Sequence, residues 1–225
     1  MNRSIIECNS LSKHFRGKNR LTKAVDGVDL QINENEFVLI KGRSGAGKST
    51  LLNLMCGLDK PTSGYITIGT DHIGNMSNKS LSRLLSEKIG IIFQNFNLLP
   101  TYTVFENIEI ALDTLPENRE KSKQTIMPLL EQLNLSEKMN SLPTELSIGQ
   151  QQKVAIARTL SKKPAIIFAD EPTGSVDDET AREIIEYLIM LKREKNVTLV
   201  MATHGSTLDS YADRIVTMHE GRLVF

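Results

Sequence analysis

The chain has 225 residues, of which 40% are hydrophobic and 24% are charged, which is enough for one large α/β domain with a substantial core, or for a domain with a smaller lobe. Lysine plus arginine and aspartate plus glutamate are equal at 27 each, so bulk charge recruits neither nucleic acid nor an anionic membrane. No apolar run approaches the ~20 residues of a membrane span, and the N-terminal residues lack the apolar core of a signal peptide, so we expect an ordinary soluble protein of the cytoplasm.

The chain contains two cysteines, Cys8 and Cys56. They lack the spacing of metal ligands, and Cys56 lies within an apolar pattern. We therefore expect two free, buried thiols in a reducing compartment.

Residues 4–40 alternate apolar and polar side chains, which predicts strand, strand, turn and strand. The strands lie over residues 5–8, 24–32 and 37–40, and the polar turn lies over residues 33–36.

Phe15 lies between the first two strands, just before the basic run 16–20, which predicts a solvated hairpin tip. An aromatic ring placed there could stack on a nucleotide base. It could equally be a core side chain at a strand end, and the residues by themselves favour neither interpretation.

Residues 37–52 pass from an apolar run through glycines into a helical pattern. Glycines let the backbone turn tightly and direct its N–H groups at phosphates bound at a helix N-terminus. Lys48 would reach the outer phosphates, and the Ser49 hydroxyl would bind Mg²⁺. The alternative is a glycine-rich turn without a ligand, but the complete G-x-x-x-x-G-K-S spacing between strand and helix argues against it. The expected phosphate-binding residues are Gly42, Arg43, Ser44, Gly45, Ala46, Gly47, Lys48, Ser49 and Thr50.

The middle of the chain is mainly helical. After the loop, the pattern predicts a helix ending near Gly57, a turn at 61–64 and a strand at 65–69. Helical patterns then cover residues 81–87, 104–112, 117–133 and 150–161, interrupted by an apolar strand at 89–94. We expect one domain over 1–225, with a core lobe of about 1–76 and 164–225 and a helical lobe of about 77–163.

The last third alternates strand and helix. Residues 165–169 form a continuous apolar strand, of the kind buried on both faces of a parallel sheet, and Asp170 and Glu171 follow at its C-terminal end. A second strand at 197–203 ends at His204. Ligand-facing residues of open α/β sheets lie at such strand ends. Residues 215–225 suggest a closing hairpin.

Two further segments narrow the class of protein. Residues 146–152 read Leu-Ser-Ile-Gly-Gln-Gln-Gln at the start of a helix, and residues 165–172 end in Asp-Glu-Pro. Together with the phosphate loop they resemble the ABC-transporter ATPase family, in matching order over essentially the whole chain. The resemblance implies a P-loop NTPase core with a mostly parallel sheet, an N-terminal antiparallel β subdomain and an inserted helical lobe. It also implies ATP and Mg²⁺ as cofactors and ATP hydrolysis coupled to transport.

The resemblance implies a role for each matched residue. Phe15 would stack on adenine, and Gln94 would sense Mg²⁺ and the attacking water at the hinge between the lobes. Asp170 would support the metal, Glu171 would polarise the water, and His204 would hydrogen-bond the γ-phosphate. The expected metal-binding residues are thus Ser49, Gln94 and Asp170.

The segment around Ser147 resembles the signature motif of the family. The resemblance implies that Ser147, Gly149 and Gln150 complete the ATP site of another copy, which gives a head-to-tail homodimer. Ile148 replaces a glycine usual in the family, so we expect weakened rather than absent function. Gly205 stands where an acidic residue is common, which bears only on local loop geometry.

Within the family, residues 93–100 and 103–107, with the Gln150 to Gln152 run, resemble the lipoprotein-release, macrolide-export and cell-division group. Such cassettes serve separate membrane permeases, so we expect a peripheral subunit on the inner face of the membrane and an envelope, peptide or drug-like substrate. The permease would bind residues 95–107, with Phe96, Leu98 and Leu99 exposed. The alternative is that these side chains fill the helical lobe.

Two other functions compete. A non-transport ABC ATPase could act on DNA or ribosomes, but such relatives usually carry a long coiled coil or a second cassette, and this chain has neither sustained heptads nor an internal repeat. We therefore expect no nucleic-acid partner. A regulatory module could bind ATP without turnover, but Glu171 and His204 argue against it.

Overall fold

The computed structural model describes residues 3–17, 21–112 and 119–224, and of Arg119 only the backbone. Three predicted features extend outside the described residues: the basic tip at 18–20, the start of the helix predicted at 117–133, and Phe225 at the end of the closing hairpin. The strands form a four-stranded and a six-stranded sheet.

The four-stranded sheet is antiparallel and has the order β2-β1-β4-β5. Its strands are β1 (Ser4–Arg16), β2 (Leu21–Asn33), β4 (Ser63–Ile68) and β5 (Asp71–His72). Alternating apolar and polar side chains along the strands explain why this sheet forms. In β2, Val28, Leu30 and Ile32 are buried while the residues between them are exposed, so one face of the sheet packs on the core.

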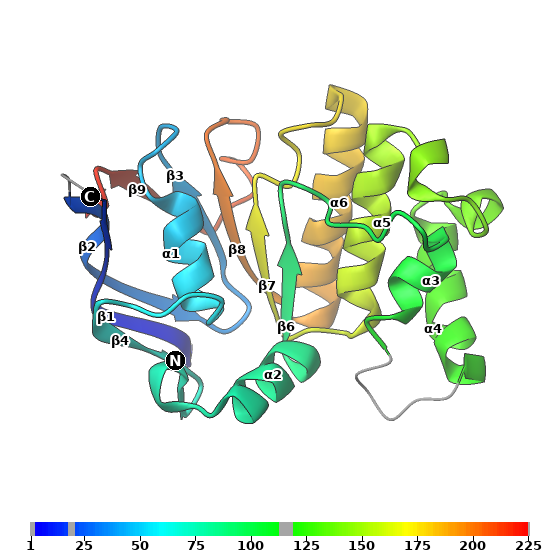
Figure 1. The fold of residues 1–225 in the computed structure, drawn as a ribbon. Coiled ribbons are helices and arrows are strands. Elements are labelled where there is room, and N and C mark those ends of the chain that lie inside the picture. Colours follow the sequence, from blue (N-terminus) through cyan, green and yellow to red (C-terminus); the bar gives the residue numbers. More distant parts are fainter. Residues whose placement is uncertain (1–2, 18–20, 113–118, 225) are drawn as a thin grey trace.

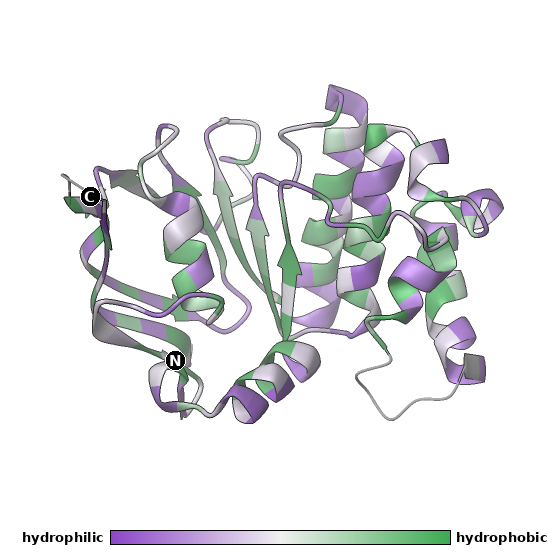
Figure 2. Cartoon of the chain, viewed as in Figure 1, coloured by the Kyte–Doolittle hydropathy of each residue, from purple (hydrophilic) through white to green (hydrophobic). Residues whose placement is uncertain are grey.

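The six-stranded sheet has the order β10-β9-β3-β8-β7-β6 and is parallel except at β10. Its strands are β3 (Phe37–Lys41), β6 (Ile89–Ile92), β7 (Ile166–Asp170), β8 (Thr198–Thr203), β9 (Arg214–His219) and β10 (Arg222–Val224). The central strands are apolar on both faces because helices cover both sides. Figure 2 shows the same hydrophobic colour along β6, the strand at the edge of this sheet.

Helix α1 (Lys48–Met55) lies between the four-stranded sheet and strands β6 to β8 (Figure 1). The core around it joins Ile66 of β4, Leu51 of α1 and Phe168 of β7. On the other face of the six-stranded sheet, a second cluster joins β3, β7 and β8 to helices α5 (Ile148–Ser161) and α6 (Asp178–Lys195). The predicted fold class, a mostly parallel sheet with an antiparallel β subdomain, is therefore observed.

A third cluster holds the helical part together. It joins α3 (Val104–Glu109), α4 (Arg119–Gln132) and α5 through buried side chains that include Ile108, Leu130 and Val154. Short 3₁₀ turns cover Ile73–Asn75, Ser136–Lys138 and Pro143–Glu145. Because α5 belongs to both the second and the third cluster, it connects the helical part to the sheet.

The position of β6 bears on the lobe boundaries. β6 is a strand of the six-stranded sheet, and Leu84 of the preceding helix α2 (Asn78–Glu87) belongs to the core around α1. We therefore propose that the helical lobe begins after β6 rather than near residue 77. No helix among the described residues combines the length and the apolar character that crossing a membrane requires.

Both cysteines are free and buried, as predicted. Burial raises the pKa of Cys8 to about 12 and that of Cys56 to about 11. Both side chains therefore stay protonated at neutral pH and serve as small apolar core residues.

Candidate nucleotide-binding site

The loop between β3 and α1 opens onto a cavity of about 1630 Å³. The opposite wall is formed by β2 and by the β9–β10 hairpin, including Ala24, Asp26 and Arg222. The predicted site residues that line this cavity are Arg43, Ser44, Gly45, Gly47, Lys48, Ser49, Thr50, Gln94, Glu171 and His204.

Two glycines let the loop pack directly on neighbouring strands. Gly47 caps α1 with a φ of 104°, and a Cβ there would lie 2.0 Å from the carbonyl oxygen of Ala24 in β2. A Cβ on Gly42 would lie 2.4 Å from the carbonyl oxygen of Met218 in β9. This close approach directs the first turn of α1, with its unpaired N–H groups and positive dipole end, at the cavity.

Lys48 is the buried cation of the cavity. Its residue is only 6% exposed, and its Nζ donates hydrogen bonds to the carbonyl oxygens of Gly42 at 2.9 Å and Arg43 at 3.3 Å. The same nitrogen lies 3.8 Å from Oε1 of Glu171. An ammonium fixed at the start of the helix can bind the outer phosphates of a nucleotide.

Asp170 and Ser49 provide a donor set for a metal ion. Within the described part of the chain, Oδ1 of Asp170 is buried and has no hydrogen-bond partner. Burial raises the pKa of Asp170 above its usual value, opposed by a hydrogen bond with Ser49, while the charge of Glu171 raises it and that of Lys48 lowers it. A carboxylate oxygen without a partner beside a hydroxyl fits Mg²⁺, which prefers oxygen ligands.

Glu171 follows β7 in a strained conformation. Its φ is 45°, in the left-handed region that non-glycine residues rarely adopt. Its backbone N–H donates to the carbonyl oxygen of Ala202 in β8 at 2.9 Å, and its Oε2 lies 3.0 Å from Nδ1 of His204. Since an ionised carboxylate only accepts, Nδ1 of His204 is the donor and Nε2 remains free to contact a ligand.

Phe15 and the predicted signature residues do not line this cavity. Phe15 is 46% exposed and does not line it, and the ammonium of Lys13 lies 5.2 Å from the centre of its ring. Ser147 and Gln150 cap α5 reciprocally: the Ser147 hydroxyl accepts from the Gln150 N–H at 3.2 Å, and the Gln150 amide oxygen accepts from the Ser147 N–H at 3.0 Å. The signature residues of one chain therefore do not line the cavity at its own phosphate loop.

Ile148 and Gly149 occupy the first turn of α5. A Cβ on Gly149 would lie 2.9 Å from Cγ2 of Thr180 in α6, so only glycine fits this contact without a shift. The Ile148 side chain is 55% exposed and meets no such restriction. This difference explains locally why an isoleucine is tolerated at the first position and a glycine is needed at the second.

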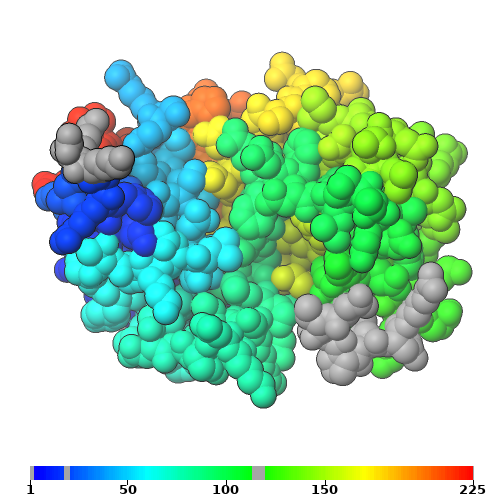
Figure 3. Space-filling model, in the orientation of Figure 1, coloured from blue at the N-terminus to red at the C-terminus, as the bar shows by residue number. Residues whose placement is uncertain are grey.

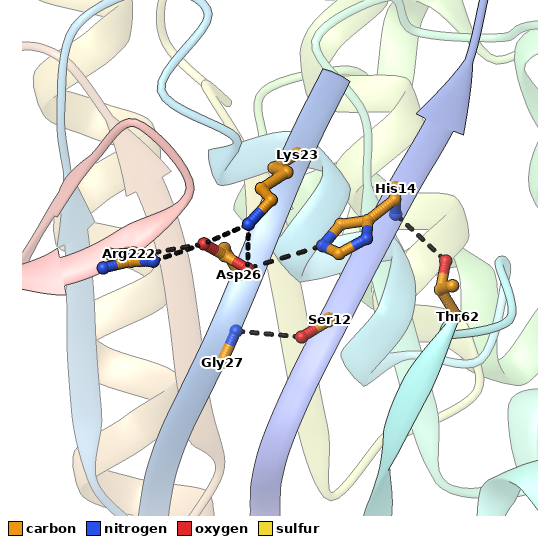
Figure 4. A network of polar contacts seen from close by, with 7 residues as sticks. All are labelled: Ser12, His14, Lys23, Asp26, Gly27, Thr62 and Arg222. Carbon is orange, nitrogen blue, oxygen red and sulfur yellow. Dashed lines mark hydrogen bonds and ion pairs between the residues drawn. The ribbon is translucent and has the colours of Figure 1, made fainter. Parts of the chain in front are cut away.

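Sequence reasoning missed a polar network on the cavity wall (Figure 4). Asp26 accepts hydrogen bonds from Nε and Nη2 of Arg222 at 3.0 and 2.7 Å, and it lies 3.4 Å from both Nζ of Lys23 and Nε2 of His14. The hydrogen bond from Arg222 holds the pKa of Asp26 below its usual value. The network joins β1, β2 and β10. Asp26 and Arg222 are 196 positions apart in the sequence, so no local sequence pattern could have predicted their contact.

The sequence model of the family described as "ABC transporter" matches residues 25–174. The chain belongs to this family. It is 36% identical to LolD, the lipoprotein-releasing system ATP-binding protein of Legionella pneumophila, over 99% of this chain and 98% of LolD. It is 38% identical to MetN, the methionine import ATP-binding protein of Staphylococcus saprophyticus, over 98% of this chain and 64% of MetN.

A dimeric structure of the ATP-binding cassette MJ0796 in a post-hydrolysis state, bound to ADP and Pi, superimposes with a TM-score of 0.93. That structure is 35% identical and covers 98% of this chain and 97% of its own. The predicted fold class and the predicted activity are confirmed: this chain is an ABC cassette that binds and hydrolyses ATP.

Proposed function

We propose that this ABC ATPase drives a separate membrane permease that exports or extracts an envelope, peptide or drug-like substrate, and that it works on the inner face of the cell membrane. The proposal rests on the observation that one chain contains only part of an ATP site in its cavity. Lys48, Gln94 and Glu171 line one cavity, whereas the signature residues at Ser147 lie elsewhere on the same chain.

In the proposed mechanism, Lys48 and the N–H groups at the start of α1 bind the phosphates of ATP. Ser49 and Asp170, with Gln94, would hold Mg²⁺, and the bound ion would neutralise charge on the phosphates. Glu171 accepts the proton of the attacking water. With its Nδ1 donating to Glu171, His204 donates to the γ-phosphate from Nε2 when it is an imidazolium, in which both ring nitrogens carry protons.

The signature residues complete the site of a second copy in this proposal. A head-to-tail homodimer brings Ser147, Gly149 and the start of α5 to the γ-phosphate bound on the partner. The dimeric MJ0796 cassette supports such an arrangement. ATP then favours the closed dimer because it gains these donors only across the interface.

The permease is proposed to bind the segment 95–107, which follows Gln94 and lies on the face shown in Figure 3. Leu99 and Tyr102 are 37% and 40% exposed. The expectation that Phe96 and Leu98 are exposed is wrong: both are half-buried, and Leu98 packs on the third cluster. Leu99 and Tyr102 are therefore the better-exposed apolar contacts.

A buried asparagine holds this segment in shape. Asn107 is 0% exposed, and its Nδ2 donates to the carbonyl oxygens of Leu99, Tyr102 and Thr103 at 3.1, 2.8 and 3.0 Å, while its Oδ1 accepts from the Leu99 N–H at 2.8 Å. Buried amides with every group bonded fix backbone geometry. The exposed side chains are thus presented on a rigid turn, which suits a docking surface.

The test is purification of the tagged chain from detergent-solubilised membranes of its own cell. We expect an integral membrane protein to copurify, and its identity would define the transported substrate class. Recovery of ribosomes or DNA without a membrane protein would support the non-transport function instead. LolD and MetN are similar to this chain to about the same degree, so the proposed subgroup rests on residues 93–100 and 103–107 and on the Gln150 to Gln152 run.

A further inference from the structure

Side chains of helix α5 form hydrogen bonds to the backbone on both sides of Gln94. Before it, Oγ1 of Thr159 lies 3.0 Å from the carbonyl oxygen of Ile91 in β6. After it, the guanidinium of Arg158 donates from Nη2 to the carbonyl oxygen of Phe96 and from Nη1 to that of Asn97, both at 2.7 Å. Gln94, which lines the nucleotide cavity, therefore lies between two backbone segments that are hydrogen-bonded to α5.

The Arg158 contact holds a turn that local sequence does not make stable by itself. Asn97 has a φ of 49°, in the left-handed region that costs energy for residues other than glycine, although asparagine tolerates it best. Two nitrogens of one planar guanidinium bind the carbonyls of the two peptide groups that flank the Cα of Asn97. Such a bidentate contact fixes the orientation of both peptide groups, which a single-point contact does not.

The charge of Arg158 strengthens these two hydrogen bonds. Among the described residues it makes no ion pair, and burial lowers its pKa without removing its charge. Lys162, the residue that caps the C-terminal end of α5, makes a similar contact at the other end of β6. Its Nζ donates to the carbonyl oxygens of Leu85 at 3.0 Å and Ile89 at 3.1 Å.

We propose that Arg158 is a positioning residue for ATP hydrolysis that acts through Gln94. By holding the backbone of Phe96 and Asn97, it keeps the Gln94 amide at the nucleotide and makes that amide follow any movement of α5. The same helix begins at the signature residue Ser147. Arg158 thus connects the two ATP sites of the dimer. The start of α5 meets the nucleotide bound by the partner, and Arg158, near the end of the same helix, positions the glutamine at the nucleotide bound by its own chain. The inference rests on the role proposed for Gln94.

The variant Arg158→Met removes the two donors and keeps the apolar stem. We expect its kcat for ATP hydrolysis to fall about 10-fold, and toward 10²-fold if Gln94 is displaced by about 1 Å. The KM for ATP and the binding of ATP without Mg²⁺ should be unchanged, because Arg158 does not line the cavity. Lys162→Met removes a similar backbone contact from the same helix without touching the segment after Gln94, and should keep kcat within about 2-fold of the parent.

A double-mutant cycle with Gln94→Ala separates positioning from general loosening of the fold. If Arg158 acts through Gln94, Arg158→Met should cause no further loss of kcat in the Gln94→Ala protein. An equal fold-loss in both backgrounds would overturn the proposal, as would an unchanged kcat in Arg158→Met. A Lys162→Met protein as slow as Arg158→Met would also overturn it.

Two controls keep the outcomes distinct. A wild-type kcat in Gln94→Ala would remove the premise that Gln94 serves hydrolysis, while leaving the ATPase and its permease untouched. If Arg158→Met does not fold in a thermal melt, Arg158→Lys takes its place in the cycle. Lysine can reach one carbonyl instead of two, so a partial loss of kcat that vanishes in the Gln94→Ala background is expected.

Discussion

The strained backbone of Glu171 is the most informative single-residue feature of the site. A left-handed conformation at a non-glycine residue costs about 1–3 kcal/mol and persists only where neighbouring contacts hold it. Here the N–H bond to Ala202, the side-chain contact with His204 and the nearby charge of Lys48 hold it. The strain is consistent with a carboxylate whose direction matters more than its contribution to stability.

Lys48 provides the first prediction at this scale. Lys48→Ala removes a buried ammonium that is fixed at the start of α1, and the lost charge-assisted contacts to phosphate are worth about 1.5–3 kcal/mol, or roughly 10- to 10²-fold in affinity. We expect weakened ATP binding and loss of turnover, measured by titration with a fluorescent ATP analogue and by phosphate release. Lys192→Ala, which breaks the ion pair with Asp213 away from the cavity, serves as the control. Equal affinities in the two variants would contradict the assignment.

At the scale of elements, the Asp26 network ties three strands at the cavity wall, and its pH dependence can be tested. The pKa of Asp26 is lowered in the fold, chiefly by Arg222, so its stabilising contribution is complete above the unfolded value of about 3.9 and is lost as pH falls toward the folded value. Asp26→Asn should unfold at lower urea concentration than the parent from pH 7 to about pH 5. Below about pH 4 the difference should shrink. A difference that grows below about pH 4 would exclude this role.

The docking segment gives a second prediction at this scale, because two adjacent leucines have different surroundings. Leu99→Ser changes an exposed side chain and should reduce copurification of the membrane partner by about 10-fold while leaving the thermal midpoint unchanged. Leu98→Ser changes a side chain packed on the third cluster and should lower the thermal midpoint instead. If Leu99→Ser destabilises the fold as much as Leu98→Ser does, the segment serves the core rather than docking.

These same elements show what sequence could and could not predict. The continuous apolar run of β7 and the glycine spacing before α1 follow from local rules of burial and backbone freedom, so both elements and the residues at their ends were predictable. The burial of Leu98 depends on where α3 packs. The pairing of Asp26 with Arg222 joins residues 196 positions apart, and the exposed position of Phe15 near the end of β1 depends on which elements pack beside that strand. Contacts of this kind arise only after the chain has folded, so no local periodicity encodes them.

At the scale of the whole molecule, the separation of the two halves of the ATP site leads to the last prediction. Glu171→Gln keeps the shape of the side chain but removes the base, and should slow turnover by about 10²–10⁴-fold if Glu171 is a general base. ATP then persists, so the variant should be monomeric without nucleotide and dimeric with ATP and Mg²⁺, because the γ-phosphate binds the start of the partner's α5 only in the dimer. Adding Ser147→Arg places a long cation at the proposed interface and removes the hydroxyl that caps α5, and should abolish the dimer. Light scattering on both variants measures this directly, with ADP as the matched nucleotide that lacks the γ-phosphate. A dimer that forms equally with ADP, or that survives Ser147→Arg, would show that the two copies associate through some other surface.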